Sequence, residues 1–278
     1  MVQHSFPAMG TTIELFVETD DASDELEAAE AEFERLEQVM SRFRPTSELS
    51  RLNEAGELDV SPELADVVGR ALEARVSSRG RFDATVHDAL VAAGYDRTFD
   101  DVPTDAPDPS PAARCGGGVS VEGRRVRLDP GTRLDLGGIG KGYAAERAAA
   151  LLALTAPCLV SAGGDIALRG VPSTGTWPIA VSDEMTLGLT QGGLATSGSE
   201  RRRWRRGGAE QHHLIDPATG RPAASDLRRV TAVGSDAVEA EVLATSLFIG
   251  GLDEALAAEA AAVLLTVDGR TFVTGGIA

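Results

Sequence analysis

The sequence predicts an α+β fold, in which helices and strands are grouped in separate regions instead of alternating as βαβ units. Helix-period segments gather in the first third of the chain, strand-like segments follow one another in the middle, and a helical stretch returns before the last strands. With 278 residues, 42 % of them hydrophobic, the chain can bury a sizeable core. No internal repeat and no clean linker interrupts it, so we expect a single domain over residues 1–278.

The first elements follow from local patterns. Thr11–Thr19 alternates apolar and polar side chains, which indicates a half-buried strand. Residues 23–40 repeat apolar side chains at three-and-four spacing with acids on the opposite face, which predicts an amphipathic helix. Ser61-Pro62 is a capping residue followed by a first-turn proline, so a second helix begins there, and Gly80 is expected to end it.

The remainder of the chain is mostly strand. Residues 96–118 hold four prolines among Asp, Ser and Gly, which is typical of a loop. An alanine-rich helix after a glycine-rich turn should end near Leu154. The other expected strands are 119–121, 126–128, 134–136, 159–161, 166–169, 179–181, 194–196, 213–215, 229–233, 262–267 and one near residue 272, with helices over 237–249 and from 252.

The charge balance is unusual. Asp and Glu total 43 against 26 Lys and Arg, a net charge of −17, and Lys141 is the only lysine. A dense acidic surface that salt must screen indicates a salt-adapted protein, and we expect it to unfold when salt is removed. Codon bias in a GC-rich genome is the alternative explanation for the arginines. A polyanion would be repelled, so general nucleic-acid binding is not expected.

One basic segment runs against this trend. Arg201–Arg206 reads RRRWRR. It is either a phosphate-binding patch or a solvated hairpin whose arginines pair with nearby acids, and the second interpretation is favoured. The two cysteines, Cys115 and Cys158, lack the spacing of a metal site or of a disulfide framework. No signal peptide or membrane-spanning run is visible, so we expect a soluble, cytoplasmic protein unless a leader has been removed from the sequence.

Three segments could carry chemistry. Asp135–Tyr143 reads DLGGIGKGY, a strand that enters a glycine-rich turn and a helix start, which favours an anion but matches neither a P-loop nor GxGxxG. A tight turn that needs glycine is an equally good explanation, although a lone lysine retained there favours a chemical role for Lys141. In His212–Gly220, HHLIDPATG, successive side chains on a strand face opposite ways, so only one of the two histidines should face a site.

The third segment is predicted to be helical. Glu241 and Thr245 are four residues apart, so they lie on one helix face and could share a hard cation. Alone, each of the last two segments is better explained as structure: a polar strand end and a buried helix with one polar stripe.

Taken together, eight blocks in one order resemble the ApbE-type FAD:protein FMN transferase family. They are AMGT from Ala8, SRFRPTSELSRLN, GRFDATV, DLGGIGKGYAAE, SAGGDIALRG, ATSGSERR, HHLIDPATGRP and EAEVLATSLFIGG. Each block is weak by itself, whereas the ordered set covers nearly the whole chain. The resemblance implies an α+β flavin transferase fold with mixed or antiparallel sheets packed with helices, FAD bound in a cleft, and Mg²⁺ near the FAD diphosphate.

The resemblance also implies roles for individual residues. His213 is the implied catalytic base, and Lys141, in the glycine-rich turn, is the second implied catalytic residue. The implied FAD contacts are Met9, Phe43, Phe82, Asp83, Ala84, Asp135, Lys141 and Ile215. The implied magnesium ligands are Gly138 and Ala244 through their carbonyls, and Glu241 and Thr245 through their side chains. Phe43 and Glu241 depart from the family's usual Tyr and Asp.

The implied reaction transfers FMN from FAD to a Thr or Ser hydroxyl of an acceptor flavoprotein and releases AMP. Phosphoryl transfer depends on positioning and on charge neutralisation, which suit an oxygen-ligated Mg²⁺, a lysine and a histidine base. Two alternatives use the same site: a Mg²⁺-dependent FAD pyrophosphatase that yields FMN and AMP, and a non-catalytic FAD-binding protein. The Glu241 departure is what keeps the last alternative open.

Overall fold

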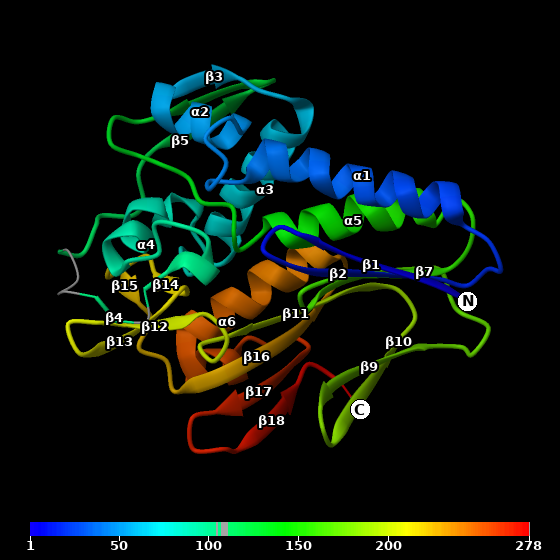
Figure 1. The fold of residues 1–278 in the computed structure, drawn as a ribbon. Helices are drawn as coiled ribbons and strands as arrows, with labels where there is room; N and C mark the ends of the chain where they lie inside the picture. The colour runs from blue at the N-terminus through cyan, green and yellow to red at the C-terminus, as the bar shows by residue number, and fades with distance from the viewer. Residues whose placement is uncertain (104, 107–110, 278) are drawn as a thin grey trace.

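The computed structural model describes residues 1–103, 105–106 and 111–277. Its centre is one eight-stranded antiparallel sheet with strand order β1-β2-β7-β8-β11-β16-β17-β18. The strands are β1 (Val2–Ala8), β2 (Thr11–Val17), β7 (Cys158–Ala162), β8 (Asp165–Arg169), β11 (Gly192–Gly198), β16 (Leu227–Gly234), β17 (Ala262–Thr266) and β18 (Thr271–Thr274). The two edges of this sheet come from the two ends of the described chain (Figure 1), and the predicted α+β class is confirmed.

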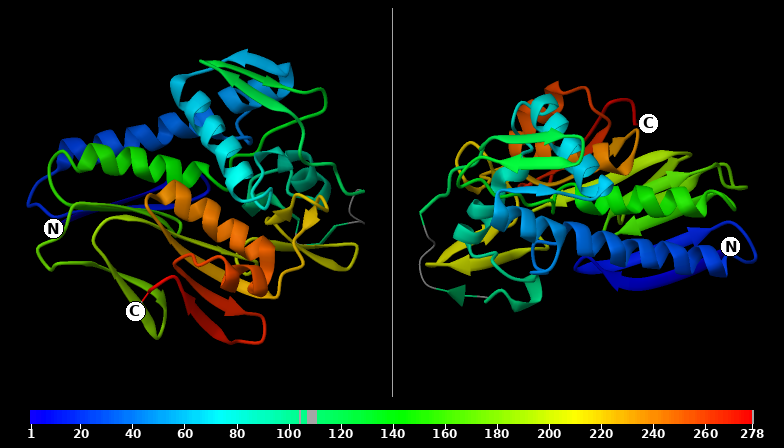
Figure 2. Two further views of the ribbon diagram at one scale, coloured as in Figure 1. Left: turned by 180° about the vertical axis from the view of Figure 1, so that it is seen from behind. Right: turned by 90° about the horizontal axis from the view of Figure 1, so that it is seen from above.

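Three helices cover one face of the sheet. α1 (Ser23–Met40) and α5 (Gly140–Leu152) run side by side over β1, β2 and β7, and α6 (Ala237–Ala257) crosses β11 and β16 (Figures 1 and 2). The alternation that predicted β2 explains the layering, because Ile13, Leu15 and Val17 are fully buried under α1 and α5. Phe16 points to the opposite face, where the hairpin β9 (Trp177–Ser182) and β10 (Met185–Leu189) closes a second apolar cluster.

Two smaller groups of elements flank the sheet. In the first, α2 (Glu48–Ala55) and α3 (Pro62–Ser77) pack with the sheet β3 (Glu57–Asp59), β6 (Arg125–Leu128) and β5 (Val119–Glu122). The second contains η1 (Ala84–Val86), α4 (His87–Ala93), η2 (Phe99–Asp101), β4 (Asp105–Ala106), β12 (Arg203–Arg206), β13 (Ala209–His212), β14 (Ile215–Asp216) and β15 (Arg221–Pro222). It surrounds an aromatic core that contains Tyr95 and Trp204.

The strand predicted over 134–136 is wrong. The backbone of Leu134 bonds to the side chain of Asn53 in both directions, at 2.8 Å each, and the backbone N–H of Asp135 donates to the Ala84 carbonyl at 2.8 Å. These partners take the backbone groups that a strand would need for a ladder. The segment is therefore an extended connection, held by α2 and η1, that leads into α5.

Two other boundaries differ from prediction. The strand predicted over 213–215 does not form: β13 ends at His212, whose ring accepts a hydrogen bond from the backbone N–H of Leu214 at 3.3 Å, and β14 begins only at Ile215. The two C-terminal helices are assigned as one, α6, but Gly251 has non-helical dihedral angles (φ 80°, ψ 180°) and marks the predicted break. Of the predicted loop over 96–118, residues 104 and 107–110 lie outside the described part, and η2 and β4 form within it.

Within the described residues, no helix has both the length and the apolar composition needed to cross a membrane.

Candidate active site

One large cleft collects segments that are far apart in the sequence. Its volume is about 780 Å³, within the range of sites that hold cofactors. The β1–β2 turn, the end of α1, the turn before α5, the β7–β8 turn, the loop before β12 and one face of α6 all contribute to its walls. Most of the blocks that suggested a flavin transferase therefore meet at one place.

The β1–β2 turn brings Met9 to the cleft. Ala8 pairs with Thr11, so Met9 and Gly10 alone make the turn. Turns of this length need positive φ, and Met9 and Gly10 have φ of 51° and 67°. For a residue with a side chain this costs on the order of 1 kcal/mol, and such strain concentrates at functional sites.

Lys141 lies between two acidic side chains from different elements. Its Nζ is 2.6 Å from Asp165 Oδ2 at the start of β8 and also donates to Glu241 Oε1 on α6. Glu241 Oε2 accepts the backbone N–H of Gly142 at 2.8 Å. The Glu241 and Asp165 side chains are only 3 % and 7 % exposed, so the cluster is a buried ionic centre at the start of α5.

This centre carries more acid than base. Burial opposes the charge on Lys141, but the two carboxylates outweigh it and raise the pKa of the ammonium, which stays protonated. Burial and the neighbouring Asp165 raise the pKa of Glu241 to about 7, because one ammonium cannot neutralise two buried carboxylates. The cluster therefore has an excess of negative charge, which would favour the binding of a further cation.

A glycine allows α5 to approach α6 this closely. A Cβ on Gly142 would lie 2.5 Å from the Ala237 carbonyl oxygen and 3.1 Å from Glu241 Oε2. Any side chain there would push the two helices apart and break the hydrogen bond to Glu241. The glycine-rich turn thus serves helix packing as well as exposing backbone groups to the cleft.

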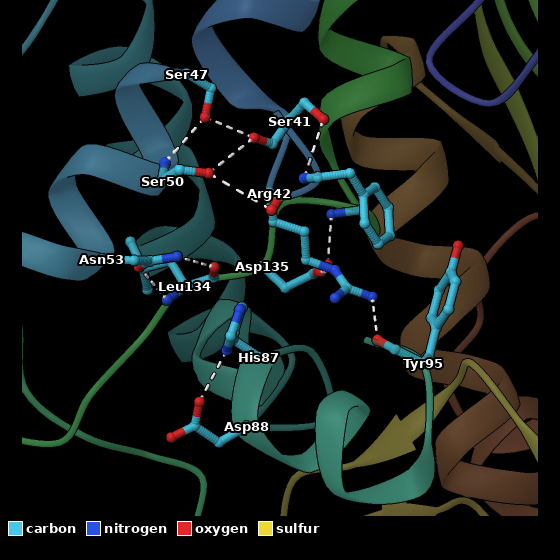
Figure 3. Close-up of polar contacts among 12 residues, drawn as sticks. Ser41, Arg42, Ser47, Ser50, Asn53, His87, Asp88, Tyr95, Leu134 and Asp135 are labelled. Carbon is cyan, nitrogen blue, oxygen red and sulfur yellow. Dashed lines mark hydrogen bonds and ion pairs between the residues drawn. The ribbon is translucent and has the colours of Figure 1, made fainter. Parts of the chain in front are cut away.

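A second ionic contact holds Asp135. The Arg42 guanidinium pairs with Asp135 Oδ2 through Nε and donates to the Tyr95 carbonyl at 2.7 Å, as Figure 3 shows. The Arg42 and Asp135 side chains are 6 % and 10 % exposed. Asp135 Oδ1 accepts the backbone N–H of Gly137 at 2.8 Å, so both of its oxygens are occupied. Asp135 lines the cleft as a fixed, paired carboxylate.

Aromatic rings surround this pair. The Arg42 guanidinium carbon lies 4.1 Å from the ring centre of Phe43 and 4.6 Å from that of Tyr95. Tyr95 in turn packs 5.6 Å from both Phe43 and Trp204. These rings form an aromatic wall of the cleft, which suits a flat heterocycle.

The segment after α3 contributes less than predicted. Phe82 and Asp83 line the cleft, but Ala84 is buried and does not, and its carbonyl binds Asp135 instead. Asp83 caps η1 by accepting from the Thr85 backbone and hydroxyl at 2.8 Å each, and its other oxygen pairs with Arg75 at 3.2 Å. Its carboxylate is thus committed to local structure.

His213 faces the cleft with an unused nitrogen. Its Nδ1 is buried and has no hydrogen-bond partner among the described residues. Burial, followed by the positive charge of Arg202, lowers the pKa of His213 to about 3. His212 points the other way, with Nε2 3.1 Å from the Ala223 carbonyl oxygen and its ring against Phe248. The expected division between the two histidines is confirmed, although His212 is half-buried and not exposed.

The remaining predicted residues divide into two groups. Gly138, Ile215 and Thr245 line the cleft, and Thr245 Oγ1 is 3.0 Å from Ser197 Oγ. Glu241 and Thr245 share one face of α6, as predicted. Ala244 is fully buried in the core under α6 and does not line the cleft.

Comparison with known proteins agrees with this geometry. The sequence model of the ApbE family matches residues 9–264. This chain belongs to the ApbE family. The FAD:protein FMN transferase of Salmonella typhimurium is 30 % identical over 78 % of the chain and 68 % of the relative, and that of Vibrio cholerae is 31 % identical over 92 % and 83 %.

ApbE proteins of known structure share the fold. The ApbE protein of Thermotoga maritima has a TM-score of 0.86 and 25 % identity, with 98 % of this chain and 96 % of that chain covered. The flavin transferase ApbE of Vibrio cholerae has a TM-score of 0.79 and 26 % identity, with 99 % and 97 % covered. The predicted family and its mixed helix and antiparallel-sheet fold are confirmed.

Sequence reasoning missed several residues of this ApbE site. Arg42 and Asp165 stood inside two of the matching blocks without a role, and Tyr95 lay outside them. The signal for Asp165 was its place directly after two glycines at a strand start. The segment RRRWRR is the hairpin that was predicted, and Arg203 pairs with Glu210 at 3.1 Å. Arg202, however, lines the cleft.

The magnesium that the family resemblance implies can be tested against these side chains. In the described residues, no group of three or more His, Cys, Asp or Glu could hold a metal by itself. Glu241 and Asp165 nevertheless converge on one cation, the Lys141 ammonium, and the Thr245 hydroxyl follows one helical turn after Glu241. Carboxylate, hydroxyl and backbone oxygens are the donors that Mg²⁺ prefers. The donor set therefore fits a hard divalent cation.

Proposed function

We propose that this chain transfers FMN from FAD to a Thr or Ser hydroxyl of an acceptor flavoprotein and releases AMP. The observation that carries the proposal is the meeting of the Lys141–Glu241–Asp165 centre and the unpartnered His213 in one cleft. Membership of the ApbE family supports it, because the most similar relatives carry the name FAD:protein FMN transferase. We also propose that residues 1–278 act as a single flavin transferase domain in the cytoplasm.

The lining of the cleft offers a different chemistry to each of the two parts of FAD. The rings of Phe43 and Tyr95 suit a flat ring system, with Met9, Phe82 and Ile215 as further apolar contacts. The helix start at Lys141 and the arginines beside it suit the diphosphate. We propose that Met9, Phe43, Phe82, Asp83, Asp135, Lys141 and Ile215 contact FAD, and that Ala84 supports the wall of the cleft from behind.

Mg²⁺ would be held by Glu241 and Thr245 with the carbonyl of Gly138, and it would draw negative charge from the diphosphate. The carbonyl of Ala244, the fourth ligand that the resemblance implies, is left out because Ala244 is buried in the core and does not line the cleft. The additional methylene of Glu241 does not keep its carboxylate from the centre, because it already reaches Lys141 and the N–H of Gly142. This geometry favours an active enzyme over a purely FAD-binding protein.

We propose that His213 takes up the proton of the acceptor hydroxyl. The acceptor oxygen attacks the phosphorus of the FMN half, the bond from that phosphorus to the bridging oxygen breaks, and AMP leaves with the electron pair. His213, neutral at pH 7, accepts the hydroxyl proton at its free Nδ1. Burial is the main cause of the low pKa of His213, and a bound diphosphate would offset the second cause, the positive charge of Arg202, so that binding of the substrate strengthens the base.

The test is mass spectrometry of a flavin-binding acceptor domain incubated with this protein, FAD and Mg²⁺ in concentrated KCl. We expect a mass gain of FMN minus water, abolished by EDTA, by replacing the acceptor's Thr with Val, and by His213→Ala. His213→Ala should still bind FAD. Free FMN and AMP without a mass gain would instead indicate a pyrophosphatase, and FAD that stays intact would indicate a binding protein.

A further inference from the structure

The arginine-rich hairpin is not uniformly solvated. Trp204 is buried in the aromatic core, and its Nε1 donates to the Ala93 carbonyl at 2.8 Å, so the start of β12 is anchored to the end of α4. Arg203 points outward and pairs with Glu210. Arg201 and Arg202, just before the strand, line the cleft. The anchored tryptophan therefore fixes the position from which these two arginines reach the site.

The strand register places Arg202 next to the proposed base. Arg203 pairs with His212 at the end of the β12–β13 ladder, so the next position along each chain sets Arg202 opposite His213. Arg202 is half-buried. Its charge is one of the causes that lower the pKa of His213, as expected for a guanidinium at this register position.

Arg202 has no acidic partner among the described side chains. It shares this property with Arg201 and Arg229 of the cleft, and differs from these two in its register position opposite His213. Arg42 is paired with Asp135, Arg44 with two glutamates of α1, and Arg81 with Glu254. Lys141 lies between two carboxylates. An enclosed guanidinium without a counter-charge is costly unless a ligand supplies one.

We propose that Arg202 binds the diphosphate of FAD and stabilises the AMP phosphate as it leaves. This inference rests on the proposed function. A guanidinium can donate two parallel hydrogen bonds to phosphate oxygens, a geometry that the lysine ammonium lacks. When the bond from the FMN phosphorus to the bridging oxygen breaks, negative charge grows on the AMP side, and a fixed cation there lowers the barrier. Arg202 would thus act on the leaving group while His213 acts on the attacking hydroxyl.

The test compares three variants of the full chain in the presence of Mg²⁺ and KCl. Arg202→Gln removes the positive charge. Arg202→Lys keeps the charge but cannot donate two parallel hydrogen bonds. Arg203→Gln, at the adjacent, outward-facing residue, is the matched control. Binding is measured with FAD and with riboflavin, which has the ring system but no phosphate, and single-turnover AMP release is measured with FAD. Thermal melting checks that each variant is folded.

Arg202→Gln should bind FAD about 10-fold more weakly and release AMP about 100-fold to 1,000-fold more slowly, with riboflavin affinity unchanged. Arg202→Lys should recover part of the FAD affinity and less of the rate, and Arg203→Gln should behave as the wild type. Equal loss of FAD and riboflavin binding, or wild-type AMP release by Arg202→Gln, would overturn the assignment. A wild type that released AMP without labelling an acceptor would refute the transferase function alone, because the same variants still decide the role of Arg202.

Discussion

Two ionic contacts in the cleft both bury charge, but they balance it differently. Beside the aromatic wall, Arg42 and Asp135 form a one-to-one pair that is stacked against rings and completed by backbone groups. At the start of α5, one ammonium serves two carboxylates, Asp165 and Glu241. A pair with equal positive and negative charge stabilises the local structure, whereas a centre with an excess of negative charge can bind another cation. The comparison indicates that the Arg42–Asp135 pair supports the fold, whereas a bound metal and its substrate would change the net charge of the Lys141–Asp165–Glu241 centre.

The largest effect should follow from removing the shared cation. In Lys141→Met, the carboxylates of Asp165 and Glu241 face each other without a cation once both are ionised, and breaking such a contact typically costs about 3–5 kcal/mol. We expect a loss of this size in the free energy of unfolding at about pH 9, where Glu241 is ionised in the wild type, without divalent ions, as measured by urea denaturation in constant KCl. Added Mg²⁺ or Mn²⁺ should restore much of it, because the ion replaces the missing positive charge.

Arg147→Met is the matched control for that experiment. Arg147 lies on the same helix, and its pair with Glu32 is exposed, so its loss should cost less than about 1 kcal/mol and show no metal dependence. If Lys141→Met were as stable as this control, or indifferent to divalent ions, the unbalanced centre would not be a cation site.

The balanced pair should respond differently. Arg42→Met leaves Asp135 buried with only the Gly137 N–H, and we expect a loss of about 3 kcal/mol that divalent ions do not restore. Adding Asp135→Asn to this variant should recover part of the loss, since the unpaired charge is then gone. Arg44→Met, two residues further along the chain, removes a partly exposed guanidinium that is paired with two glutamates, and serves as the control. A rescue of Arg42→Met by Mg²⁺ would erase the distinction between the two ionic contacts.

The elements around the cleft differed in how far the sequence predicted them. The bounds predicted for α1 are those of the structure, whereas the predicted ends of β2 and α5 lie about two residues too far along the chain. The Glu241–Thr245 spacing correctly indicated a shared helix face. The strand predicted over 134–136 failed, because its backbone partners are a side chain 81 residues away and the carbonyl of Ala84. Local pattern carries no information about such partners.

The site residues show the same limit. Ordered motifs located Lys141, Glu241 and His213, but only the fold shows which acids surround the lysine. Asp165 becomes its partner because β8 and α6 meet at the start of α5, and Arg42 becomes the partner of Asp135 because α1 ends beside the connection to α5. Arg202 was expected to be solvated because neither the burial of Trp204 nor the hairpin register could be read from the segment itself.

His213 offers the smallest and most graded test, since burial and the charge of Arg202 both oppose its protonation. Its pKa in the folded protein is about 3, against about 6.5 in an unfolded chain. Above pH 6.5 neither state binds a proton there. Below pH 6.5 the histidine binds a proton in the unfolded chain but not in the folded protein, so the free energy of unfolding falls as the pH decreases towards 3.

Between pH 7 and pH 5 this term amounts to about 2 kcal/mol, and His213→Gln should lack it. We therefore expect the difference in unfolding free energy between the variant and the wild type to shift by that amount in favour of the variant over this interval, as urea titrations at fixed KCl would measure. Saturating FAD should shrink the shift, because a bound diphosphate beside Arg202 and Lys141 makes protonation of His213 easier. Parallel pH profiles for the two proteins without FAD would mean that His213 is hydrated and not enclosed, and would remove the physical basis for its role as the base.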